Sequence, residues 1–341
     1  MAEAEADFNS SAPNFATRFA MAAISGDVTK LKQMIATGHD INALDSMGVA
    51  ALHMVCGVGA LEAVEALLDA GADRNVLSAL RMTPLSDAMA GNYNPVVRLL
   101  LERGADPNQL IDTDTSPLTL AASGGEEEQV RLLLKHKASQ LPLPPSKDPA
   151  ALTVAAGAGH LHVVRLMHEE FGTDLNIVSG ADGTPPLCAA IQYHREDCFY
   201  YLLKKGANIH VLGADGLISA LEVAVTSNNP WATAELLKRG MAVDGVGDKK
   251  RFTSLIAAAL SGAAKSAAVL LAHGADIDAV STAGNNARSI AKELGHDNIV
   301  ELIDQEQRRR HLNAVEQDAA HAHGGIGTAI KISRPLVFRK P

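Results

Sequence analysis

An apolar residue returns every 33 to 35 residues along most of this 341-residue chain, and a period of this length is typical of stacked repeat proteins. We call this position the anchor, and nine units of the chain contain it. Its occupants are Phe19, Leu52, Leu85, Leu118, Leu152, Leu187, Leu221, Leu255 and, in the last unit, Arg288. The residue fifteen places later is apolar in every unit, and the residue three places later is alanine in eight of the nine. Because two further positions keep the period, we predict one elongated array instead of separate globular domains.

Each unit carries the sequence signals of two helices followed by a turn-rich segment. Thr83-Pro84 and Ser116-Pro117 place a hydroxyl and a proline where a first helix would begin. A glycine or polar residue seven places after the anchor, such as Gly59, is expected to end that helix. The second helix then carries an apolar stripe and ends at a glycine nineteen places after the anchor, such as Gly71. We call the polar, turn-forming stretch that follows the finger.

These residues resemble the ankyrin-repeat family, whose unit of about 33 residues starts with a T-P-L-H-x-A motif. Thr83-Pro84-Leu85 matches that start, and Gly159-His160 and Gly295-His296 match the turn between the two helices of the family's unit. The resemblance covers about nine repeats over residues 15–307. It implies an all-α solenoid of helix–turn–helix–finger units stacked into a curved array. It also implies that a protein partner binds on a concave surface formed by the fingers and the exposed side of the first helices.

The repeat boundaries divide the chain into three regions. We expect an acidic N-terminal arm over residues 1–14, the solenoid with polar end units over residues 15–307, and a basic helix extension and docking tail over residues 308–341. The last region holds seven basic and two acidic residues, a net charge of +5, whereas the remaining 23 basic and 37 acidic residues give −14. The apolar and basic end of the chain, which includes Leu336 and Phe338, could dock on a partner or on the acidic body, and a disordered tail is the alternative.

The sequence lacks the motifs of the common enzyme classes. It has no P-loop, no nucleophile elbow, no HExxH motif and no dinucleotide fingerprint, so we predict a protein that is not an enzyme and needs no cofactor or metal. Cys56, Cys188 and Cys198 form no CxxC pair and are predicted to be buried free thiols in a reducing compartment. No stretch reaches the roughly 18 apolar residues of a membrane helix, and the acidic start does not resemble a signal peptide. We therefore expect a cytoplasmic protein, with a nuclear location as the alternative.

The charge of the body bears on the kind of partner. An acidic solenoid disfavours binding of nucleic acid by the repeats, because the phosphate backbone is also negative. It favours a partner with a basic surface, although the charge could serve solubility alone. The function predicted from these features is that of an interaction module or adaptor. The alternatives are a permanent structural component of a cytoskeletal or multi-protein assembly, anchored by the C-terminal tail, and a reversible inhibitor or regulatory subunit of an enzyme or transcription factor.

Apolar residues in the polar fingers are the main candidates for partner contact. Met47 and Val49 precede the second anchor, Leu80 and Met82 precede the third, and Phe252 precedes the eighth. The first four lie on adjacent fingers and could form one apolar patch, or could instead serve contacts between the fingers.

Two aromatic residues and a proline-rich segment are further candidates. Trp231, the one tryptophan of the chain, occupies a position that is mostly polar in the other units and could be a binding hot spot, or could pack on Pro230. Tyr193, at the end of a first helix, is predicted to face the groove. Residues 142–147 match a PxxPxK polyproline ligand, with a proline-stiffened finger as the alternative.

Overall fold

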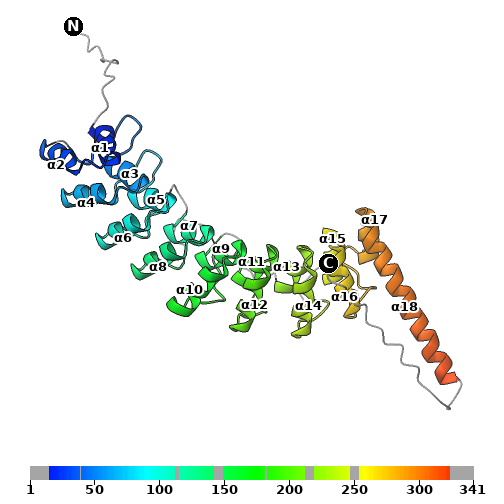
Figure 1. Ribbon diagram of the computed structural model, residues 1–341. Coiled ribbons are helices and arrows are strands. Elements are labelled where there is room, and N and C mark those ends of the chain that lie inside the picture. Colours follow the sequence, from blue (N-terminus) through cyan, green and yellow to red (C-terminus); the bar gives the residue numbers. More distant parts are fainter. Residues whose placement is uncertain are drawn as a thin grey trace, which may run out of the picture.

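The computed structural model describes residues 15–38, 40–111, 115–141, 149–180, 183–211, 219–245 and 253–322. This part of the chain contains eighteen helices, which alternate between two layers (Figure 1). The first helices of the units are α1 (Phe15–Ile24), α3 (Ala51–Gly57), α5 (Pro84–Ala90), α7 (Pro117–Gly124), α9 (Ala151–Ala158), α11 (Pro186–Gln192), α13 (Ala220–Thr226), α15 (Ser254–Ser261) and α17 (Ala287–Glu293). The second helices are α2 (Val28–Ala36), α4 (Leu61–Asp69), α6 (Asn94–Glu102), α8 (Glu127–Lys135), α10 (Leu161–Phe171), α12 (Glu196–Lys204), α14 (Pro230–Lys238), α16 (Ala264–Ala272) and α18 (Asp297–Ala322).

The hydrophobic core runs along the whole array between the two layers. The eight apolar anchors, Phe19 to Leu255, expose at most 2% of their surface, and so do the small residues three places after them. Full burial of one leucine contributes about 2 kcal/mol, and the small residue beside it lets the paired helix approach closely. Among the described residues there is no β-sheet, only isolated bridges within three fingers. The predicted all-α repeat array is therefore confirmed.

The predicted helix starts and stops have the expected geometry. The side chain of Thr83 accepts a hydrogen bond from the backbone N–H of Ser86, and Pro84 occupies the first turn of α5. Gly59, seven places after its anchor, has a φ of +73°. Where the equivalent position holds Asn92, its φ is +54°, since asparagine tolerates the left-handed region better than most residues.

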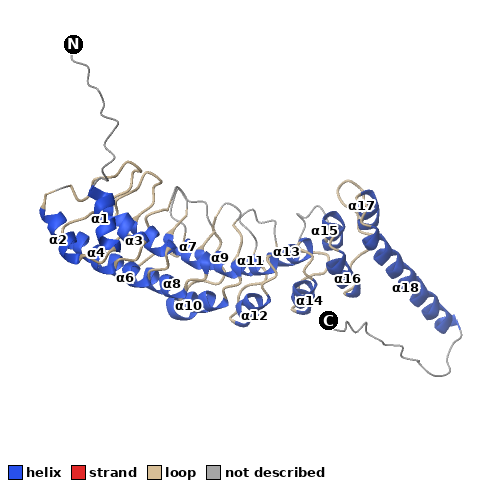
Figure 2. Cartoon of the chain, turned by 45° about the horizontal axis from the view of Figure 1, so that its top comes forward, coloured by secondary structure: helices blue, strands red, loops and turns tan. Residues whose placement is uncertain are grey.

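Three units lack the glycine that ends the second helix. In the fourth unit Lys137 takes its place and adopts the same left-handed conformation, with a φ of +66°. In the fifth unit Phe171 remains inside α10 and the turn is displaced to Gly172, whose φ is +65°. In the last unit Gln307 takes the glycine's place, and α18 continues without a turn to Ala322. This continuation makes α18 project beyond the array (Figures 1 and 2). At its base, the guanidinium of Arg288 donates two hydrogen bonds of 2.6 and 3.0 Å to Asp304.

A row of asparagine side chains links successive fingers. The Oδ1 of Asn75 accepts a hydrogen bond of 2.9 Å from the backbone N–H of Asp106, one finger further along. The same bond recurs at distances of 2.7 to 2.8 Å, where the backbone N–H of Asp73 donates to Asn42, that of Ser139 to Asn108 and that of Asn208 to Asn176. Each bond gives a hydrogen-bond acceptor to a backbone N–H group of the finger that has no partner within a helix or a sheet. The fingers are thereby held in register along the inner side of the curve, above the layer of first helices (Figure 2).

No helix in the described ranges is both long enough and apolar enough to cross a membrane.

Candidate functional site

The first finger closes into a tight turn whose shape is set by Asp45. Its carboxylate accepts hydrogen bonds of 2.9 Å from the backbone N–H groups of both Met47 and Val49. Its own N–H donates to the carbonyl of Val49, and Leu44 pairs with Ala50 in an antiparallel bridge. The Met47 side chain at the tip of this turn lies in solvent.

The second finger packs directly against the first through a glycine. The N–H of Ala79 donates to the carbonyl of Gly48 at 2.8 Å. A Cβ added to Gly48 would lie 2.4 Å from the Cβ of Ala79, so only glycine permits this approach, and its φ of +71° also favours glycine. The two finger tips therefore form one continuous surface.

A buried histidine connects the second finger to the helix layer. His53 on α3 is 2% exposed; its Nδ1 accepts from the N–H of Ala50, which leaves Nε2–H as the donor to the carbonyl of Met82 at 3.0 Å. Burial lowers the pKa of His53, against the opposing effect of its hydrogen bonds to the carbonyls of Met82 and Val76. The neutral ring thus fixes the base of the finger that carries Leu80.

The structure places the four finger residues predicted from the sequence in two groups. Met47 and Leu80 stand at the two neighbouring tips with 76% and 78% of their surfaces exposed. Val49 and Met82, further down the fingers, are half-buried. The hydrogen bonds within and between the two fingers fix their backbone, so little backbone freedom is lost when a partner binds. The two exposed apolar side chains can therefore serve as contacts for an apolar partner surface.

The first helices contribute a row of side chains that the sequence pattern did not bring to attention. On α5 the buried residues are Pro84, Leu85, Ser86, Ala88 and Met89, so the side that faces away from the second-helix layer carries Asp87. The equivalent position, two places after the anchor, is occupied from α1 to α9 by Met21, Met54, Asp87, Leu120 and Val154. Met21 and Leu120 are exposed and the other three are half-buried. We call this set the inner row. The sequence signal for this row is the large side chain that recurs two places after each anchor in the first five units.

Asp87 is the single charged member of the inner row. Burial raises the pKa of its carboxyl to about 6. Its charge also adds to the effect of burial in raising the pKa of the Cys56 thiol on α3. Among the described residues no hydrogen bond or ion pair reaches the Asp87 carboxylate.

The two predicted aromatic contacts lie elsewhere on the array. Tyr193, 56% exposed, follows α11, and its ring lies over Gly157 of α9, where an added Cβ would be 3.1 Å from Cδ2. Trp231 is half-buried on α14, in the second-helix layer, with its ring centroid 5.0 Å from that of Phe199 and 6.2 Å from that of Tyr200. This cluster fills the space between α12 and α14, so Trp231 has a packing role within the chain.

The other predicted sites lie outside the described residues. These are Phe252, Leu336, Phe338, the proline-rich segment 142–147, and the N-terminal arm over residues 1–14.

The three cysteines are buried, as predicted, and burial raises the pKa of Cys188 to about 12 and that of Cys198 to about 11. Burial therefore favours the protonated thiol over the nucleophilic thiolate at neutral pH. Within the described ranges no three histidine, cysteine or acidic side chains gather in a way that could hold a metal ion.

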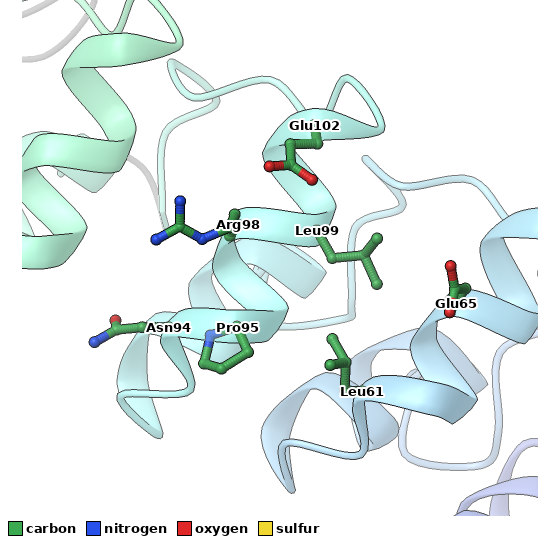
Figure 3. Close-up of a pocket in the computed structure, with 7 residues that line it drawn as sticks. All are labelled: Leu61, Glu65, Asn94, Pro95, Arg98, Leu99 and Glu102. Carbon is green, nitrogen blue, oxygen red and sulfur yellow. The ribbon is translucent and has the colours of Figure 1, made fainter.

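A shallow groove of about 370 Å³ lies on the second-helix layer, between α4 and α6 (Figure 3). Leu61, Pro95 and Leu99 form its apolar floor, and Glu65, Arg98 and Glu102 surround it. Arg98 is paired with Glu128 of α8 at 2.5 Å. The charged residues that line the groove are all exposed.

The comparison with protein families matches more than half of the chain. The family model described as "Ankyrin repeats (3 copies)" matches residues 19–111 and residues 118–212, which include both finger tips and the inner row. A search of the curated proteins returned no match.

Proposed function

Because the chain belongs to the ankyrin-repeat family, whose repeats generally mediate protein–protein interaction, we propose that it is a non-enzymatic adaptor that binds a protein partner on the finger side of the array. The contact surface consists of the first two finger tips and the inner row. Tyr193 contributes at the periphery of the same side.

The observation that supports this proposal most strongly is the exposure of Met47 and Leu80. Each exposes more than three quarters of its surface, and the Gly48–Ala79 contact holds them side by side. Leaving large apolar side chains in water at adjacent, well-ordered tips contributes nothing to folding. Covering them with an apolar partner surface would contribute about 1 to 2 kcal/mol each, which is more than most interface residues contribute.

Paired variants of the full chain test the proposal. The double variant Met47→Ser/Leu80→Ser removes the tips, and Leu312→Ser/Val315→Ser is the matched control, since those side chains are 61% and 50% exposed on the projecting part of α18. Proteins captured on each form from the native cell would be quantified by mass spectrometry. We expect one partner that is retained by the wild type and the control and depleted at least tenfold on the finger variant.

The opposite result has a definite meaning. A partner that is lost on the α18 control and retained on the finger variant would contradict binding on the finger side. It would favour a component of an assembly that is anchored at the C-terminal end of the chain.

A further inference from the structure

Resting on the proposed function, we infer that the partner presents a lysine or arginine, flanked by apolar residues, whose cationic group pairs with Asp87 in the middle of the inner row. This assigns both a specificity-determining residue and a chemical class of ligand to the finger side of the array.

Asp87 lies on the side of α5 that faces away from the second-helix layer, and it is half-buried there. Its helix, α5, packs on α6 with the opposite face and is flanked by α3. The residue beside it on α3 is Gly57, which has no side chain to cover Asp87; a Cβ added there would lie 3.9 Å from the Asp87 Cβ. The adjacent outward residue of α5 is Ala90, which is small and exposed. A side chain from outside the molecule can therefore reach the carboxylate.

The neighbours of Asp87 along the inner row are apolar on both sides. Met21 and Met54 precede it, and Leu120 and Val154 follow it. A half-buried carboxylate without a hydrogen-bond donor is costly in such a place, which agrees with its raised pKa. An unpaired charge that reduces stability is typical of a residue used for binding.

A cationic side chain is the ligand that fits this surface. The aliphatic stem of lysine or arginine can lie on the methionine and leucine side chains while its charged end meets the carboxylate. A nucleic acid does not fit, because the acidic body repels phosphate. A bare metal ion does not fit either, because Asp87 belongs to no cluster of potential ligands in the described part of the chain.

Peptide display on the immobilised full chain tests the inference. Peptides selected on the wild type and competed by free protein are expected to share one lysine or arginine between apolar residues. The best peptide and a version in which glutamine replaces its lysine or arginine would then be compared. Fluorescence polarisation would measure the affinity of both peptides for the wild type and for Asp87→Asn. We expect the cation to strengthen binding about tenfold on the wild type and less than twofold on Asp87→Asn. Glu62→Gln, an exposed carboxylate on α4, is the matched control and should retain the tenfold effect.

The outcomes separate the inference from the proposed function. Loss of peptide binding on Met47→Ser/Leu80→Ser would show that the peptides bind the finger side. If such peptides have no preference for a cation, or if the preference is the same on Asp87→Asn as on the wild type, the role of Asp87 is refuted and the adaptor proposal stands. If the selected peptides are unaffected by the finger variant, both are refuted. Circular dichroism of each variant excludes unfolding as the cause of a loss.

Discussion

Replacing Asp87 by asparagine should stabilise the protein at neutral and alkaline pH. Burial raises the pKa of this carboxyl from 3.8 to about 6. At about 1.4 kcal/mol per pH unit, the ionised form would cost the folded state about 3 kcal/mol if it were fully shielded from water. Because the side chain is only half-buried, solvent screens part of this cost, and we expect Asp87→Asn to gain about 1 to 1.5 kcal/mol.

The gain should depend on pH in one direction only. Between pH 3.8 and about 6 the folded state binds more protons than the unfolded state, so the wild type loses stability as the pH rises through this window. Asp87→Asn has no such group. Its advantage should be complete near pH 8 and shrink to a few tenths of a kcal/mol near pH 4.

Urea unfolding of the wild type, Asp87→Asn and the control Glu62→Gln, followed by circular dichroism at the two pH values, would measure this difference. Hydrogen exchange of α3 and α5 would show whether the gain is local, since a repeat array can unfold in segments. Equal stability of wild type and Asp87→Asn near pH 8, or a gain that does not change with pH, would refute the argument that the carboxylate is partly desolvated and unpaired.

Three further changes test the platform that carries the candidate surface. Gly48→Ala should lower the free energy of unfolding by about 2 to 3 kcal/mol. Gly26→Ala should lower it by only about 1 kcal/mol, because Gly26 has the same φ of +71° but no atom within 4 Å of the added Cβ. Equal losses would show that the finger contact is unimportant. As the pH falls below 6.5, the wild type should lose stability, because the folded state keeps His53 neutral while the unfolded state protonates it. Between about pH 7.5 and pH 5.5 the melting temperature of His53→Gln should therefore change less than that of the wild type. Identical pH profiles of the two proteins would contradict the role of this ring. Asn75→Ala should cost about 1 kcal/mol and speed hydrogen exchange at the amide of Asp106, whereas unchanged exchange there would mean that the asparagine row does not hold the fingers.

Repeating positions made most of the fold predictable. Leu52, Leu85 and their equivalents recur at a fixed spacing because each unit must bury the same face against its neighbours, so one sequence pattern reports both the helices and their stacking. Turn residues were equally informative, since Gly59 and Asn92 adopt the left-handed conformation that the break between helices requires. The displaced turn at Gly172 was not foreseen, because helix ends shift by a residue at little cost.

The candidate surface was only partly visible in the sequence. Met47 and Leu80 were identified because apolar residues in polar fingers break the pattern. Trp231 breaks the pattern in the same way, yet it packs against Phe199, because an unusual residue can fill an unusual gap between neighbouring helices as readily as it can face solvent.

The sequence by itself determined that this chain is a stacked ankyrin array, where most of its helices begin and end, and which side chains form its core, because these properties depend on contacts that every unit repeats. The tertiary structure alone decided which irregular side chains are covered and which are left open. The exposure of an aspartate two places after an anchor depends on the residue that the preceding unit places beside it. Gly57 places no side chain beside Asp87, and that juxtaposition of α3 and α5 exists only once the units are stacked.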